Sequence, residues 1–144
     1  RGAPVPRRVV VAVALGEPGK DDVLFAGRLI RHLSAAATLL TVISRDAAED
    51  ERERAHRFLE AGVRTMAALG VTARSLVSRG EVVSGVRALL QQESAEMLVI
   101  GAPLSPDGED PRFNGIAREL VERTDAPALL CVRSSLRAPG RSLA

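Results

Sequence analysis

Seven consecutive apolar residues at positions 9–15, Val-Val-Val-Ala-Val-Ala-Leu, constrain the fold of this 144-residue chain more than any other feature. Valine favours strands, and the run contains no polar residue that would mark a solvent-facing side. A strand that is apolar along its whole length is covered on both faces, which is typical of parallel sheets flanked by helices. We therefore predict a central strand in an α/β domain.

The rest of the chain alternates short apolar runs with segments of helical spacing. Further strands are predicted at residues 39–43, 71–77, 97–100 and 128–132. The mixed pattern of residues 71–77, with Val71, Ala73 and either Leu76 or Val77 facing inward, suits an edge strand. Every connection is long enough to hold a helix, so the fold class is a doubly wound parallel sheet of five strands and four helices.

Four helices are predicted between these strands. Gly16, Pro18 and Gly19 are expected to break the chain after the first strand, so that Asp21 or Asp22 caps the first helix. The second helix is predicted over residues 46–69, because its acidic opening complements the helix dipole and a glycine follows it. Apolar spacing predicts the remaining helices at residues 82–94 and 116–124.

Size and composition indicate one domain. We expect a leader at residues 1–7, the domain at 8–133 and a flexible tail at 134–144. No apolar run approaches the roughly eighteen residues that a membrane span requires, so a cytoplasmic protein is expected. The single cysteine, Cys131, lies in an apolar run, which favours a buried structural thiol and a reducing compartment.

The charge pattern argues against nucleic acid as a partner. The formal net charge is +2, but arginines in the two tails account for the excess of basic residues. The body between the tails has no basic stripe, and the chain has no Trp, no Tyr and three Phe for stacking on bases. No nucleic-acid binding is therefore expected.

The segment after the fourth strand is the candidate ligand loop. Residues 97–100 are apolar, and Gly101 is expected to end the strand there. Residues 102–113 contain three prolines and one glycine, so neither helix nor strand is expected to continue through them, and helical spacing resumes at Ile116. The backbone amides near Asn114 and Gly115 are expected to be the unpaired donors of the first turn of that helix, which is a common phosphate site in open parallel sheets. Gly101 can equally serve only a turn, and Asn114 only a helix cap.

Several segments resemble the universal stress protein family. They are Arg79-Gly-Glu81, Ala95-Glu-Met-Leu-Val-Ile-Gly101 and the closing segment at residues 123–133, and the resemblance covers about residues 8–133. The resemblance implies a Rossmann-like sheet with strand order 3-2-1-4-5 and dimerisation. In one branch it also implies ATP at the carboxyl edge of strands one, two and four.

The sequence departs from the motif of that ATP-binding branch. The branch carries Gly, two residues, Gly, nine residues, then Gly followed by Ser or Thr. Gly101 matches the first glycine, but Leu104 stands at the second. Asn114 and Gly115 then occupy the last glycine and the hydroxyl position, or Gly115 and Ile116 do if one residue is inserted. The hydroxyl is missing in both alignments.

The adenosine side of the implied site differs too. Ala14 stands at the end of the first strand, where ATP-binding members place an aspartate near the ribose. Val42 matches the position whose backbone meets adenine. The loop adds the carboxylates of Asp107, Glu109 and Asp110, which repel phosphate. We therefore expect a site that has lost ATP or changed its ligand.

The leading hypothesis is a non-catalytic regulatory or interaction domain with a degenerate nucleotide site and no resident cofactor. Two alternatives are an adenine-nucleotide-binding protein with slow or no ATP hydrolysis, and the cytosolic domain of a membrane transporter or sensor. No metal-ligand spacing, nucleophile motif or phosphate-loop lysine is present. A homodimer is predicted through the fifth strand, by residues Ala128, Leu129, Leu130, Cys131 and Val132.

Overall fold

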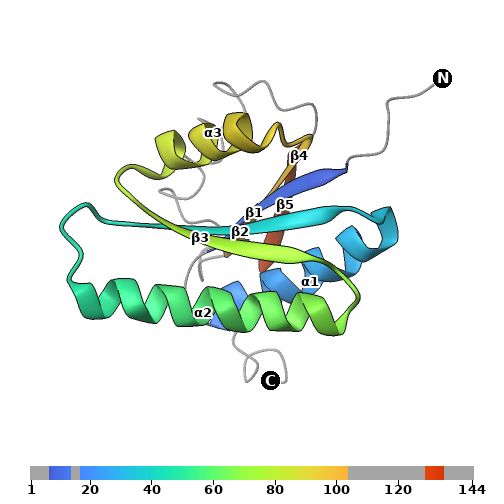
Figure 1. The fold of residues 1–144 in the computed structure, drawn as a ribbon, viewed down its shortest axis with the longest axis horizontal. Helices are drawn as coiled ribbons and strands as arrows, with labels where there is room; N and C mark the ends of the chain where they lie inside the picture. Colours follow the sequence, from blue (N-terminus) through green and yellow to red (C-terminus); the bar gives the residue numbers. More distant parts are fainter. Residues whose placement is uncertain (1–6, 14–16, 104–128, 135–144) are drawn as a thin grey trace, which may run out of the picture.

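The computed structural model describes residues 7–13, 17–103 and 129–134 (Figure 1). The predicted fourth helix lies outside these residues, as do residues 1–6 of the predicted leader and the tail from residue 135. In chain order the elements are β1 (Arg8–Ala12), α1 (Glu17–Leu33), β2 (Ala36–Ile43), α2 (Glu49–Ala68), β3 (Ala73–Arg79), α3 (Val82–Glu93), β4 (Met97–Pro103) and β5 (Leu129–Ser134).

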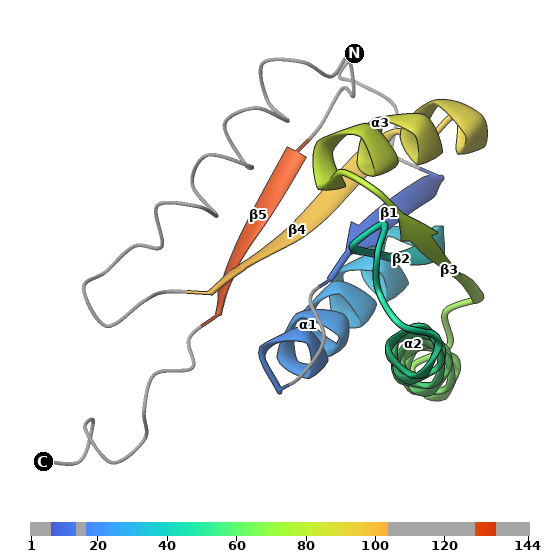
Figure 2. The ribbon, with the colours of Figure 1, turned by 90° about the vertical axis from the view of Figure 1, so that its left-hand side faces the viewer.

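The strands form one parallel sheet in the order β3-β2-β1-β4-β5. Helices α1 and α2 lie on one face of the sheet and α3 lies on the other (Figures 1 and 2). The predicted α/β class with a parallel sheet is confirmed, and the strand order is the one that the resemblance implied.

The central strand is buried on both sides, as its composition predicts. Val9 and Val11 pack into a core with residues of α1 and α2, whereas Val10 packs into a second core with residues of α3. All three valines are 0% exposed. The strand β1 ends at Ala12 rather than at residue 15, and residues 14–16 lie outside the described part of the chain.

The start of the first helix was predicted wrongly. The helix α1 begins at Glu17, so Pro18, Gly19, Asp21 and Asp22 all lie inside it and neither aspartate is its N-cap. Proline is tolerated in the first turn because the N–H it lacks has no partner within a helix there. The breaker residues therefore mark the first turn of the helix instead of the loop before it.

The prediction that Gly101 ends the fourth strand was also wrong. The strand β4 continues to Pro103, because Gly101, Ala102 and Pro103 pair with Val132, Arg133 and Ser134 of β5. The printed register of β4 with β1 stops at Ile100. Beyond that point β4 has a described strand partner on one side only, a situation in which sheets accept proline.

The edge position predicted for the third strand is confirmed. The strand β3 pairs with β2 along its length and is the first strand in the sheet order. Val77 packs against the core, whereas Leu76 is 41% exposed, so Val77 rather than Leu76 is the residue that faces inward.

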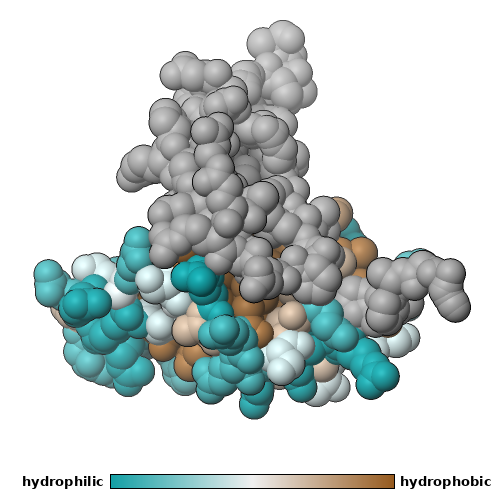
Figure 3. All heavy atoms as spheres, turned by 90° about the horizontal axis from the view of Figure 1, so that it is seen from above, coloured by the Kyte–Doolittle hydropathy of each residue, from teal (hydrophilic) through white to brown (hydrophobic). Residues whose placement is uncertain are grey.

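Hydrophilic side chains cover much of the described surface seen from above the sheet, with smaller hydrophobic areas between them (Figure 3).

The bounds of two other elements differ from prediction by about three residues. The strand β2 begins at Ala36, before the predicted start at residue 39, because Ala36 and Ala37 pair with β1. The helix α2 begins at Glu49, and residues 44–48 form the preceding loop. The predicted end of α3 is confirmed by Ser94, which follows Glu93 in the left-handed conformation.

Two glycines allow α1 and α2 to pack closely on their neighbours. A Cβ atom at Gly62 of α2 would lie 2.8 Å from Cδ1 of Leu39, a fully buried residue of β2. A Cβ atom at Gly27 of α1 would lie 2.7 Å from Cδ1 of Leu69, which is only partly buried. Both distances are shorter than real Cβ contacts, so the packing depends on the absence of these side chains.

Candidate functional site at the carboxyl edge of the sheet

The strand order places a candidate site at the carboxyl ends of β1 and β4. The chain moves from β1 outward to β2 and β3, then returns across the sheet to β4 on the other side of β1. The place where the strand order reverses in this way is called the switch point. In open parallel sheets, ligands bind at the switch point, outside the carboxyl ends of the strands. Figure 2 faces this edge of the sheet.

The strands beside β1 extend past it. The last paired residue of β1 is Ala12, which pairs with Leu40 of β2 and Ile100 of β4. Residues 41–43 of β2 and 101–103 of β4 continue beyond these pairs and belong to strands that have partners on their outer sides. The end of β1 therefore lies between two longer strands whose inner backbone edges face it.

The backbone of Val42 points toward the end of β1. Leu40 accepts a hydrogen bond from the amide of Val13 at 2.9 Å, and Ile43 accepts one from the amide of Gly80 at 2.9 Å. The backbone carbonyl of Leu40 thus faces β1, and the backbone carbonyl of Ile43 faces β3. Because successive backbone carbonyls of a strand point to opposite sides, the carbonyl of Val42 faces β1 as that of Leu40 does.

The side chain of Val42 has a separate role in packing. It lies against the second core, and a Cβ atom at Gly85 of α3 would be 3.1 Å from its Cγ2 atom. The isopropyl group is thus occupied by the contact between β2 and α3. What Val42 presents to the switch point is therefore its backbone, and its role toward a base stays a prediction.

A buried hydroxyl fixes the end of β1 to β2. Thr41 is 4% exposed, and its Oγ1 donates a hydrogen bond to the carbonyl oxygen of Val13 at 2.5 Å. A threonine hydroxyl as buried as this one would be left unsatisfied without such a partner. The sequence shows the threonine but gives no sign of its partner, which is 28 residues away.

Arg79 is a second residue of this edge that the sequence analysis did not single out as a site residue. It closes β3, and its Nη1 donates to the carbonyl oxygens of Arg45 at 3.2 Å and Ala47 at 2.9 Å. Both carbonyls belong to the loop that follows β2. The sequence signals were the place of Arg79 and Gly80 just after the strand predicted at residues 71–77, and the Arg79-Gly-Glu81 segment of the resemblance.

The structure describes two of the six predicted site residues. Val42 and Gly101 lie on β2 and β4, the strands that flank β1, and each lies beyond the last paired residue of β1. Ala14, Leu104, Asn114 and Gly115 lie outside the described residues, and their roles stay predictions. The two that are described therefore lie on opposite sides of the predicted switch point.

Residues 7–13, 17–103 and 129–134 contain no cluster of three or more His, Cys, Asp or Glu side chains arranged to hold a metal ion. Both histidines are exposed, and His56 lies 3.2 Å from Glu60 in the next turn of α2. Within the same residues, no helix combines the length and the hydropathy needed to cross a membrane.

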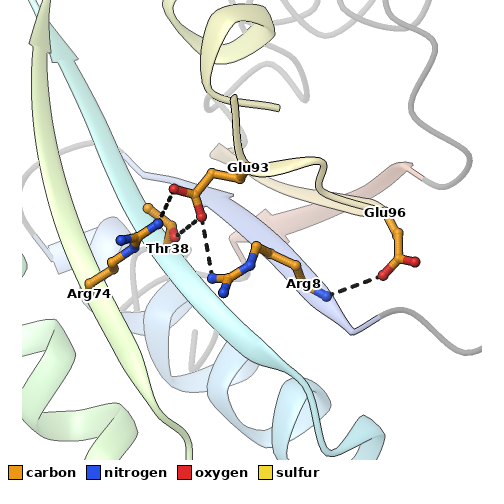
Figure 4. A network of polar contacts seen from close by, with 5 residues as sticks. All are labelled: Arg8, Thr38, Arg74, Glu93 and Glu96. Carbon is orange, nitrogen blue, oxygen red and sulfur yellow. Dashed lines mark hydrogen bonds and ion pairs between the residues drawn. The ribbon is translucent and has the colours of Figure 1, made fainter. Parts of the chain in front are cut away.

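A charged network centred on a buried carboxylate lies at the opposite, amino edge of the sheet (Figure 4). Glu93, in the last turn of α3, has a side chain only 6% exposed. It accepts a hydrogen bond from Thr38 of β2 at 3.0 Å, lies 3.3 Å from the guanidinium of Arg8 on β1 and forms an ion pair with Arg74 on β3. This cluster joins α3 to three strands at the end remote from the candidate ligand site.

Glu96 makes a second connection at the amino edge. Its Oε1 accepts hydrogen bonds from the backbone amides of Arg7 at 2.6 Å and Arg8 at 3.3 Å. Through these backbone amides the carboxylate holds the start of β1 beside the start of β4.

The sequence matches no protein-family model and no curated protein at a significant level. Solved structures, in contrast, match along most of the chain. The universal stress protein UspA from Lactobacillus plantarum has a TM-score of 0.77 at 14% identity, over 92% of this chain and 100% of its own. A universal stress protein from Archaeoglobus fulgidus in complex with dAMP has a TM-score of 0.70 at 16% identity, over 90% and 99%.

A universal stress protein family protein from Arabidopsis thaliana, with AMP bound, has a TM-score of 0.67 at 16% identity, over 94% of this chain and 99% of its own. The parallel sheet, its switch point and the helices on both faces define the class as a doubly wound α/β domain. Within that class, the chain has the fold of the universal stress proteins.

Proposed function

We propose that this chain is a regulatory domain of the universal stress protein kind, which binds an adenine nucleoside monophosphate in preference to ATP and does not catalyse hydrolysis. Solved neighbours of the same fold are in complex with dAMP, cAMP and AMP. The observation that carries the proposal for this chain is the backbone of Val42, whose carbonyl faces the end of β1 at the switch point.

An inward-facing carbonyl is suited to adenine. The carbonyl oxygen of Val42 is an acceptor, and the exocyclic amino group of adenine is a donor. Guanine carries a carbonyl oxygen at the equivalent ring position, so the two acceptors would repel each other. A base placed at the tip of β2 would put its ribose over β1 and its phosphate toward the segment that follows β4.

Sequence features of that segment argue against a triphosphate. Leu104 replaces a glycine that would let the backbone approach phosphate, and neither Gly115 nor Ile116 supplies the hydroxyl. Three carboxylates in the same segment, Asp107, Glu109 and Asp110, repel each added phosphate further. The sequence contains no motif that would supply a base to orient water, which supports a binding role rather than hydrolysis.

Isothermal titration calorimetry with AMP, dAMP, cAMP, ADP and ATP, with and without magnesium, tests the proposal. We expect AMP to bind at least about tenfold more tightly than ATP, because phosphate contacts are lost and repulsion is added. The double substitution Leu104→Gly with Ile116→Ser restores the residue types of the motif, in the alignment that has one inserted residue, and should narrow this difference between the AMP and ATP affinities. Tighter binding of ATP than of AMP, or no heat with any nucleotide, would contradict the proposal.

Self-association through β5 is a second proposed property. The strand β5 is last in the sheet order and pairs with β4 on one side, which leaves one backbone edge without a described strand partner. The predicted contact residues are Ala128, Leu129, Leu130, Cys131 and Val132. Sedimentation equilibrium should give a dimer, whereas a monomer at high concentration would count against this interface.

A further inference from the structure

The loop between β2 and α2 is held by contacts with the end of β3. Within the loop, the amide of Ala47 donates to the carbonyl of Ser44 at 3.1 Å, which closes a turn. From outside, Nη1 of Arg79 donates to the carbonyl oxygens of Arg45 and Ala47. The amide of Gly80 donates to Ile43, the last residue of β2, at 2.9 Å. A second internal hydrogen bond runs from the amide of Asp46 to Oγ of Ser44 at 3.2 Å. Arg79, at the end of β3, therefore holds the loop itself, and Gly80 holds the strand end that precedes the loop.

The guanidinium of Arg79 is well suited to hold these carbonyls. Its planar group offers several donors in fixed directions, and a charged donor forms a stronger hydrogen bond than a neutral one. Its side chain is 35% exposed, so solvent competes only in part for these donors. Nη2 also lies 3.9 Å from Oε1 of Glu49, the first residue of α2. Arg79 thus links the loop and the start of α2 to the sheet.

The anchored loop directly follows the backbone group on which base recognition depends in the proposed function. Val42 is one residue from Ile43, whose carbonyl is tied to Gly80, and two residues from Ser44, where the turn begins. Without the Arg79 contacts, the end of β2 can fray more readily past the pairing of Val42 with Ser78, and the carbonyl of Val42 then no longer keeps one fixed direction. A hydrogen bond to a base requires that direction to be kept within a narrow range.

We propose that Arg79 is a positioning residue that sets both the affinity and the base preference of the nucleotide site, without touching the nucleotide. The inference rests on the proposed function. A rigid acceptor at Val42 favours adenine, because its amino group donates there, and rejects guanine, because its carbonyl oxygen meets another acceptor. A mobile acceptor can turn away from guanine, so loss of Arg79 should weaken AMP binding and reduce the discrimination against GMP.

Calorimetric titrations of AMP and GMP into the wild type, Arg79→Ala and Arg79→Lys measure both effects. If the aligned loop falls to about a tenth of the population in Arg79→Ala, the apparent Kd for AMP rises about tenfold. The dissociation constant for GMP divided by that for AMP should fall by about threefold or more, because the misaligned loop, now the larger population, no longer rejects guanine. Lysine keeps the positive charge and can reach one carbonyl, but it lacks the planar guanidinium group with several donors. Arg79→Lys should therefore have an AMP affinity and a base preference between those of the wild type and Arg79→Ala.

The matched control is Arg74→Ala, an arginine on the same strand that contacts Glu93 at the opposite edge of the sheet. It should lower stability but leave the AMP affinity and the base ratio within about twofold of wild type. Amide NMR shifts of residues 42–48 without nucleotide should move in Arg79→Ala and stay unchanged in Arg74→Ala. This readout reports the loop even where affinity is low.

Three results would overturn the inference. An AMP affinity for Arg79→Ala within twofold of wild type would show that the anchor does not act on the site, while the proposed function would stand. An equal loss in Arg74→Ala would show general destabilisation. Absence of AMP binding by the wild type would refute the proposed function, and the inference with it.

Discussion

Replacing Glu93 by glutamine should destabilise the wild-type domain but stabilise a variant that lacks both arginine partners. The carboxylate is almost fully buried, whereas the side chains of Arg8 and Arg74 are 37% and 65% exposed. In Glu93→Gln the arginines lose an ion pair but can be hydrated where they are. The expected loss is about 1–2 kcal/mol, the scale of a charged hydrogen bond discounted for solvent screening.

Removal of both arginines has a different consequence. In Arg8→Ala with Arg74→Ala, the buried carboxylate keeps Thr38 as a donor but loses both cations. An uncompensated buried charge costs about 3–5 kcal/mol, a large part of the stability of a small domain. Glutamine at position 93 in this background removes the charge and keeps an acceptor for Thr38, so it should recover about 2 kcal/mol.

Urea unfolding followed by far-UV circular dichroism measures these differences, because the chain has no Trp or Tyr as a fluorescent probe. The matched control is Glu96→Gln, since Glu96 accepts from backbone amides and should be indifferent to the arginine side chains. Its effect should be the same in both backgrounds. The reasoning is refuted if Glu93→Gln destabilises the double variant as much as the wild type.

Two further substitutions test packing and the end of β1. Gly62→Ala should lower the free energy of unfolding by about 1–2 kcal/mol, because the new methyl group meets the fully buried side chain of Leu39. Gly27→Ala should lower it less, because its neighbour Leu69 is partly exposed and can move. Equal effects in urea unfolding would argue against this packing. Thr41→Val should cost about 1–3 kcal/mol by leaving the Val13 carbonyl without its donor, whereas Thr41→Ser should cost less. If Thr41→Ser and Thr41→Val lower the free energy of unfolding equally, the hydroxyl of Thr41 does not stabilise the fold through this hydrogen bond.

The features of the fold that leave a local pattern of apolar and polar residues could be predicted from the sequence. The polar-free run of residues 9–15 predicted a strand covered on both faces, and Val9, Val10 and Val11 are fully buried. The mixed pattern of residues 71–77 predicted the edge position of β3. These features could be predicted because burial on one face or two leaves a local pattern of apolar residues.

Features set by distant partners could not be predicted in this way. Pro18 lies in the first turn of α1 rather than before it, and nothing local distinguishes the two positions. The extension of β4 through Pro103 depends on pairing with β5. At the candidate site, the resemblance pointed to Val42, but Arg79 could not be recognised because the carbonyls that it binds lie 32 and 34 residues away.

The separation of Glu93 from the switch point affects how this domain can change its ligand. Thr38, which contacts Glu93, and Ile43, at the far end of β2, are about 17 Å apart at the rise of an extended strand. At this distance two unit charges interact by only about 1 kcal/mol at an effective dielectric constant of about 20. A bound anion could therefore gain or lose a phosphate with little electrostatic effect on the ion pairs that secure α3. Selection could exchange one ligand for another here while leaving the folding energetics of the sheet nearly untouched.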